Sequence, residues 1–190
     1  MSTSEKQHIT IAISGASGAI YAQRLIDKLN SLTGQVAALT VVFTQNAGEI
    51  WKQELQTPLP TGDKISLHAN NNFYAPIASG SAKTHSMIII PASMGIIGRI
   101  AHGTSDDLIT RAADVMLKER RRLIVVPREA PYNLIHIRNM EALTLAGAIV
   151  CPATPSFYQN PKTIEDLVDT VVDRIIDLMG IRHDSFRWGQ

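Results

Sequence analysis

The sequence contains one cysteine and almost no net charge, and it lacks long apolar runs. With Cys151 as the only cysteine in 190 residues, the chain can form neither a disulfide framework nor a cysteine-based zinc site. A formal net charge of +1 argues against a nucleic-acid-binding protein. No apolar run reaches the length of a membrane span, and Met1 to Gln7 lack the apolar region of a signal peptide. These absences predict a cytoplasmic protein with neither a membrane nor a nucleic-acid partner.

The composition is that of one folded unit. Apolar residues make up 45% of the chain and charged residues 18%, which is enough apolar material for a sizeable core. We expect one domain over residues 1–190, with a core at about 8–180 and a C-terminal tail at 181–190. Trp188 in that tail is expected to pack on another surface, such as a second subunit.

Strand and helix patterns alternate along the chain. Apolar, β-branched runs predict five strands, at residues 8–13, 35–43, 87–90, 123–126 and 148–151. Residues 70–81 are expected to form a long irregular segment. Short crossovers favour a mostly parallel sheet with helices on both faces. The predicted fold is therefore α/β, a three-layer sandwich.

Charged side chains on two helices leave alternatives open. Ser105 is expected to cap a helix on which Arg111, Asp114 and Lys118 share one face. That stripe is either a solvated set of ion pairs or a cationic patch directed at an anion. In the last helix, Leu167, Val171, Ile175 and Leu178 should face the core. Arg174 lies at the edge of that face, and it is either paired at the surface or reaches into a site.

Two loops of small residues directly follow predicted strands, at residues 14–19 and 91–95. A strand, a small-residue loop and a helix can present backbone N–H groups to a phosphate, although the same pattern occurs in ordinary tight turns. The loops contain neither a GxGxxG fingerprint nor a P-loop lysine. Parallel strands would bring these loops, Arg128, Glu129 and Tyr158 to one edge of the sheet, where such folds bind ligands. The loops suit a planar cofactor with one phosphate, and FMN fits better than a dinucleotide.

Five motifs together resemble the flavin prenyltransferase family (UbiX-like proteins, formerly called aromatic-acid decarboxylases). The resemblance covers residues 8–189. In chain order the motifs are Ser14-Gly15-Ala16-Ser17-Gly18-Ala19, Ser93-Met94-Gly95, Arg111-Ala112-Ala113-Asp114 with Lys118-Glu119-Arg120, Pro127-Arg128-Glu129, and Pro155-Ser156-Phe157-Tyr158.

The resemblance implies a fold, an assembly and a reaction. The fold is flavodoxin-like (Rossmann-like), and the assembly is a homododecamer. The reaction transfers a dimethylallyl group from a prenyl monophosphate to N5 and then C6 of reduced FMN. A UbiD-type decarboxylase uses the product, prenylated FMN.

The resemblance also implies residue roles. The expected FMN contacts are Gly15, Ala16, Ser17, Thr44, Ser93, Met94, Gly95, Ile96 and Arg128. The expected prenyl-phosphate contacts are Phe73, Arg111, Lys118, Tyr158 and Arg174. The expected catalytic residues are Ser17, Glu54, Lys118 and Glu129.

These residue types suit the implied chemistry. Dimethylallyl monophosphate must lose inorganic phosphate, and two arginines, a lysine and a tyrosine can hold the leaving dianion. Magnesium is then unnecessary, and Asp106-Asp107 does not begin a DDxxD metal motif. Glu129, next to Arg128, should stay ionised and act as a base.

Four residues depart from the pattern of the family. Phe73 stands where several relatives carry tryptophan, Ile96 where they often carry threonine, Ala92 where cysteine is frequent, and Thr44 where they carry serine. None of these departures removes a charged participant.

Two other functions compete with prenyl transfer. An FMN-dependent cysteine decarboxylase of the same fold would carry a Pro-x-Met-Asn-x-x-Met-Trp segment. Here the corresponding residues, 152–158, read Pro-Ala-Thr-Pro-Ser-Phe-Tyr. A non-catalytic flavin-binding module would need the small loops but not Arg111, Lys118, Glu129, Tyr158 and Arg174 together.

Overall fold

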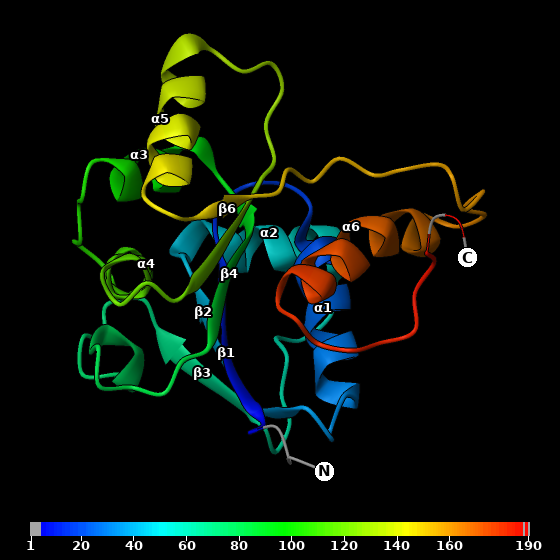
Figure 1. The fold of residues 1–190 in the computed structure, drawn as a ribbon, viewed down its shortest axis with the longest axis horizontal. Coiled ribbons are helices and arrows are strands. Elements are labelled where there is room, and N and C mark those ends of the chain that lie inside the picture. Colours follow the sequence, from blue (N-terminus) through cyan, green and yellow to red (C-terminus); the bar gives the residue numbers. More distant parts are fainter. Residues whose placement is uncertain (1–4, 188, 190) are drawn as a thin grey trace.

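A computed structural model describes residues 5–187 and 189, so Trp188 lies outside the described residues. Its strands form one parallel sheet with the order β3-β2-β1-β4-β5-β6 (Figure 1). The strands are β1 (Gln7–Ile13), β2 (Val36–Phe43), β3 (Ile65–Ala69), β4 (Ser86–Ala92), β5 (Arg122–Pro127) and β6 (Ile149–Val150).

Helices cover both faces of the sheet (Figure 1). One face packs against α1 (Ala19–Ser31), α2 (Gln45–Leu55) and α6 (Ile164–Leu178). The other packs against α3 (Met94–Ala101), α4 (Leu108–Lys118), α5 (Leu134–Leu145) and the 3-10 helix η1 (Pro76–Ala78). This arrangement confirms the predicted three-layer α/β sandwich. Within the described ranges, no helix has the length and apolar character needed to cross a bilayer.

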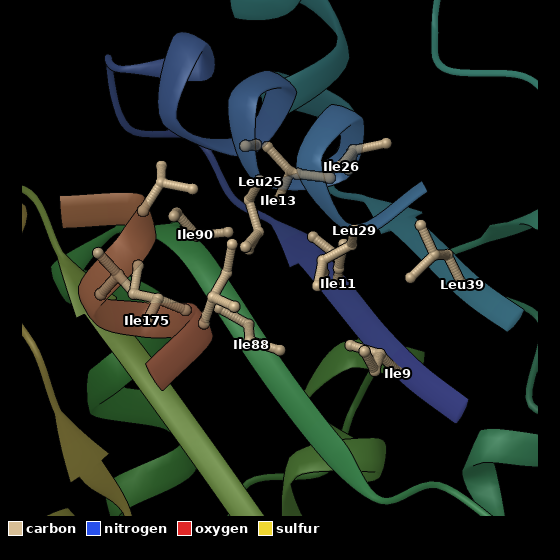
Figure 2. Packing of buried hydrophobic residues seen from close by; sticks show 14 of the residues in the cluster. Ile9, Ile11, Ile13, Leu25, Ile26, Leu29, Leu39, Ile88, Ile90 and Ile175 are labelled. Carbon is tan, nitrogen blue, oxygen red and sulfur yellow. The ribbon is translucent and has the colours of Figure 1, made fainter. Parts of the chain in front are cut away.

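The core between the sheet and the α1 layer is rich in isoleucine. Figure 2 shows Ile11 of β1 and Ile88 of β4 packed against Leu25 of α1 and Ile175 of α6, and all four are fully buried. Each such side chain contributes about 1.5–3 kcal/mol to folding through burial. This packing fixes the layer of α1, α2 and α6 on one face of the sheet.

The core face of α6 differs from the prediction at two positions. Val171 and Ile175 are buried as expected, but Leu167 and Leu178 are only half-buried. The buried stripe instead includes Val168, Val172 and Ile176. Paired β-branched residues give α6 two possible stripes, and packing against the sheet selects between them.

The prediction of five strands is wrong, because β3 adds a sixth. β3 pairs only with β2 and lies at an edge of the sheet, with Ser66, Leu67 and Ala69 exposed. An exposed edge strand needs no continuous apolar run, and the sequence therefore lacks the signal on which the prediction relied.

The start of α4 also differs from the prediction, because Asp107 rather than Ser105 is the N-cap. An Asp107 side-chain oxygen accepts a hydrogen bond of 2.8 Å from the Thr110 amide, and the Thr110 hydroxyl accepts one of 3.2 Å from the Asp107 amide. This reciprocal pair is a capping box.

Candidate active site

The carboxyl ends of β1, β2 and β4 border a cavity of about 430 Å³. Its lining residues are Ser14, Gly15, Thr44, Gln45, Asn46, Asn70, Ser93, Gly95, Ile96, Arg99 and Asp107. Five of the nine residues expected to contact a cofactor therefore lie together, namely Gly15, Thr44, Ser93, Gly95 and Ile96. Of the other four, Ala16 and Met94 are buried, and Ser17 and Arg128 lie in a separate cluster.

Two helix N-termini face this cavity. The Thr44 hydroxyl accepts from the Ala47 amide at 3.3 Å and caps α2, and the Ser93 hydroxyl accepts from the Ile96 amide at 3.4 Å and caps α3. The remaining amides of each first turn have no acceptor within the helix, and both helix dipoles favour negative charge at this end. The cavity is therefore suited to a phosphate.

Buried Ser14, directly after β1, is hydrogen-bonded to the end of β4 beside the cavity. Its hydroxyl donates to the Pro91 carbonyl at 2.8 Å and accepts from the Ser93 amide at 2.7 Å. Gly15 has a packing reason to lack a side chain, because a Cβ there would lie 3.0 Å from the Asn46 Cβ. The small residues of the first loop thus keep β1, β4 and α2 close together.

The N-terminus of α1 is already occupied by a carboxylate of the chain itself. Glu54, near the end of α2, accepts hydrogen bonds from the Gly18 amide at 2.9 Å and the Ala19 amide at 2.8 Å. Burial alone would raise the pKa of Glu54, but hydrogen bonds from the Ser17 hydroxyl and these amides, with the charge of Arg128, lower it. Arg128 also donates from Nε to the Ser17 carbonyl at 2.8 Å. Ser17, Glu54 and Arg128 therefore form one cluster beside the cavity at the ends of β1, β2 and β4.

Glu129 follows Arg128 at the end of β5. Its side chain is exposed and accepts a hydrogen bond of 2.9 Å from the Ala130 amide. This contact holds the carboxylate on the loop at the carboxyl edge of the sheet. Phe73, which is 46% exposed, lies in the loop after β3 at the same edge.

Tyr158 and Arg174 share a second cavity, of about 520 Å³. The loop after β6, α6 and the C-terminal tail line it through Ser156, Tyr158, Gln159, Thr170, Asp173, Arg174, Asp177, Ser185, Phe186 and Arg187. The Arg187 guanidinium donates to Asp177 at 2.8 Å and anchors the tail to α6. Sequence reasoning missed Asp177 and Arg187, since only the fold brings the tail back along α6.

Arg111 and Lys118 lie apart from that cavity within one chain. Arg111 donates to Asp114 at 2.9 Å and to the Ala78 carbonyl at 3.0 Å, and Lys118 pairs with Glu119. Because α4 runs antiparallel to the strands, Lys118 lies near the amino-terminal edge of the sheet, whereas Tyr158 follows the carboxyl end of β6. In the single chain the stripe on α4 is therefore a set of ion pairs.

Two more charged residues, Arg99 and Asp107, border the 430 Å³ cavity and were not expected there. Arg99 donates from Nη1 to Asp106 at 2.7 Å and to Asp107 at 2.8 Å. Burial would raise the pKa of Asp107, but the Thr110 amide and the Arg99 guanidinium lower it. Both residues follow β4 at some distance in sequence, and no motif marks them. Among the described residues, no group of three histidine, cysteine or acidic side chains could hold a metal ion.

Comparisons with known proteins agree with this geometry. The Flavoprotein family matches residues 1–176. The flavin prenyltransferase UbiX of Halalkalibacterium halodurans is 44% identical over 194 residues, covering 95% of this chain and 93% of the relative. The chain belongs to the flavin prenyltransferase family.

Solved structures of the flavin prenyltransferase family share the fold over nearly the whole chain. AnUbiX (PadA1), solved in complex with FMN and dimethylallyl pyrophosphate, aligns with a TM-score of 0.87 at 37% identity, covering 96% of this chain and 100% of that one. A dodecameric FMN-dependent UbiX-like decarboxylase from Escherichia coli O157:H7 aligns with a TM-score of 0.88 at 36% identity, covering 97% and 100%. The peptidyl-cysteine decarboxylase EpiD aligns with a TM-score of 0.61 at 14% identity, which shows a shared fold alone.

Proposed function

We propose that the protein transfers a dimethylallyl group from dimethylallyl monophosphate to N5 and C6 of reduced FMN. The observation that carries this proposal is the likeness to AnUbiX (PadA1), whose structure contains FMN and dimethylallyl pyrophosphate and spans almost all of this chain. We assign residues 1–190 to one FMN-binding unit, and a likeness that covers 96% of the chain supports this assignment.

The cavity at the carboxyl edge fits the phosphate end of FMN. The hydroxyl-capped N-termini of α2 and α3, at Thr44 and Ser93, would hold a phosphate without a metal ion. Glu54 occupies the N-terminus of α1, so that helix is unsuited to the same task. Bound reduced FMN would supply the nucleophilic atoms that receive the prenyl group.

Tyr158 and Arg174 are the residues we assign to the prenyl phosphate. They border one cavity, and a guanidinium with a phenol can stabilise the phosphate dianion as it leaves. Lys118 and Arg111 would join them from a second copy of the chain, because α4 lies too far from this cavity within one chain. Exposed apolar residues on α5, namely Leu134, Ile135, Ile137 and Leu145, support burial against another copy.

Two carboxylates are assigned to proton handling. Glu54, with its lowered pKa, stays ionised at neutral pH, where it accepts a hydrogen bond from the Ser17 hydroxyl and orients that hydroxyl without leaving the N-terminus of α1. Glu129 is exposed at the carboxyl edge, where it would act as the base that removes a proton from the alkylated carbon.

A homododecamer and a UbiD-type decarboxylase as recipient of the product complete the proposal. The dodecameric relative from Escherichia coli O157:H7 supports the assembly. Magnesium independence and a cytoplasmic location stay predictions from the sequence.

The mass of the flavin tests the proposed reaction. The purified protein is mixed with reduced FMN and dimethylallyl monophosphate without oxygen, and we expect the flavin mass to rise by one C5 unit. A parallel reaction with a peptide ending in cysteine tests the decarboxylase alternative. An unchanged flavin mass, or loss of carbon dioxide from the peptide, would reject prenyl transfer.

A further inference from the structure

A groove of about 570 Å³ lies at the amino-terminal edge of the sheet, opposite the candidate active site. It is lined by Glu5, Gln7, Lys83, Thr84, His85, Ser86, Arg120, Arg121 and Arg122. Four of these side chains are cationic and one is a carboxylate, so the groove carries excess positive charge. None of its residues belongs to the proposed flavin or prenyl-phosphate site.

The floor of the groove contains a hydroxyl that lacks a protein partner. Ser86, the first residue of β4, is 1% exposed, and its Oγ has no hydrogen bond within the described residues. Its register partner in β5 is Arg122, so the hydroxyl lies beside the cationic rim. This hydroxyl is closed off from solvent, so a ligand in the groove would contact the cationic rim rather than the Ser86 side chain.

The neighbouring histidine is oriented as a donor. His85 Nδ1 accepts a hydrogen bond of 3.0 Å from the backbone amide of His8. Because Nδ1 acts as an acceptor, the proton of the neutral ring is on Nε2. His85 Nε2–H is therefore a hydrogen-bond donor at the groove.

Arg120 occupies a backbone conformation that normally selects glycine. Its φ is 54°, and its amide donates to the Leu117 carbonyl while that of Arg121 donates to the Met116 carbonyl. This is a Schellman motif with arginine at the left-handed position. A side chain there is strained, and strain of this kind is a reason to look for a function.

Cations near a helix C-terminus commonly bind backbone carbonyls, but only part of this cluster does so. Arg121 donates to the carbonyls of Gly80 and Ala82, and Arg122 to that of Met179, so both satisfy backbone acceptors. The Arg120 side chain forms no hydrogen bond or ion pair within the described ranges. Lys83 has only a 3.9 Å contact with Glu5, and both side chains are largely exposed. Arg120 and Lys83 therefore remain available to an anion.

We propose that this groove binds the phosphoryl group of a small molecule, through Arg120, Lys83 and His85. A guanidinium fork and an ammonium match the charge of a phosphoryl group, and the imidazole supplies a directed donor. Within one chain the groove lies at the opposite edge of the sheet from the cavity of Tyr158 and Arg174, and the proposal does not depend on prenyl transfer.

Inorganic phosphate and tungstate are suitable probes. Equilibrium dialysis of the FMN-loaded protein at physiological salt should show one more bound phosphate per chain than in Lys83→Gln/Arg120→Gln. Arg174→Gln, which alters the proposed prenyl-phosphate site, should keep the additional phosphate. Lys52→Gln on α2 is the matched surface control and should bind as the wild type does. Tungstate soaked into crystals should give an anomalous peak within reach of Arg120 and Lys83.

Arg120→Gly gives a readout that a purely structural arginine would not. Glycine relieves the left-handed strain, so the midpoint of thermal unfolding should rise while the affinity for phosphate falls about tenfold. Prenyl transfer should be unchanged. The proposal is overturned if phosphate binds equally to all variants, if tungstate avoids the groove, or if a second copy of the chain fills it in the assembled protein.

Discussion

The Glu54 carboxylate accepts a hydrogen bond of 2.8 Å from the backbone amide of Ala19, so the end of α2 caps the start of α1. The Gly18 amide donates to the same carboxylate at 2.9 Å. Gly18 itself has a φ of 106°, a conformation that favours glycine. This contact neutralises one helix N-terminus at the carboxyl edge and leaves those of α2 and α3 for a phosphate.

Glu54→Gln should destabilise the fold by about 0.5–1 kcal/mol at neutral pH, because a neutral amide loses the interaction with the helix dipole. The folded-state pKa of Glu54 is lowered, so its stabilisation is present above the unfolded-state pKa of about 4.3. It is lost as the pH falls through the lower folded-state value. Urea unfolding of both proteins at several pH values should show this difference shrink in acid. Glu49→Gln is the control, and a difference independent of pH would contradict the assignment.

Asp107→Ala should lower the free energy of unfolding by about 1–2 kcal/mol, because it removes the capping box of α4. It also breaks the ion pair with Arg99. Ser105→Ala, two residues earlier, should change the free energy of unfolding by less than about 0.5 kcal/mol. Chemical denaturation of the two variants compares the caps directly, and equal losses would show that Asp107 is not the cap that matters.

Ile88→Ala should destabilise the protein by about 2–5 kcal/mol, because Ile88 is fully buried between the sheet and the α1 layer (Figure 2). Ile164→Ala, at a side chain that is 68% exposed, should change stability by no more than about 0.5 kcal/mol. Thermal unfolding at a fixed protein concentration measures both. A small effect at Ile88 would mean that neighbouring core side chains fill the space left by the removed atoms.

Arg174→Ala and Lys118→Ala should each abolish most prenyl transfer when every chain carries the substitution. If the two residues act from different copies, co-expressed chains carrying one substitution each will form some intact sites. Random mixing at a two-chain site predicts roughly a quarter of the wild-type sites. The fraction of active sites is checked by measuring the flavin mass on mixed oligomers, which are purified with a different tag on each chain. No recovery would place both residues on one chain or outside the site.

Glu129→Gln should keep FMN binding and lose turnover, because an amide cannot remove the proton that the carboxylate is assigned. FMN affinity is measured by fluorescence quenching, and turnover by the rise in flavin mass. Glu49→Gln again serves as the matched surface control. Unchanged turnover in Glu129→Gln would remove Glu129 from proton transfer.

Local sequence patterns predicted most of the fold because buried strands and amphipathic helices have their own periodicity. The runs around Ile11 and Ile88 form strands where the patterns place them, and Val171 and Ile175 of α6 face the core as expected. Edge strand β3 escaped detection, since exposure removes the apolar pattern.

Motif order in the sequence was sufficient to assign the family and a list of candidate residues, because strand-end loops carry recognisable small and charged residues. Only the tertiary structure decided which of those residues meet. It brought Glu54 to Ala19 and the tail to Arg174, and it separated Lys118 from Tyr158. The physical reason is that distances between residues far apart in sequence depend on the direction in which each helix packs and on where the tail folds back. No local sequence pattern encodes these distances.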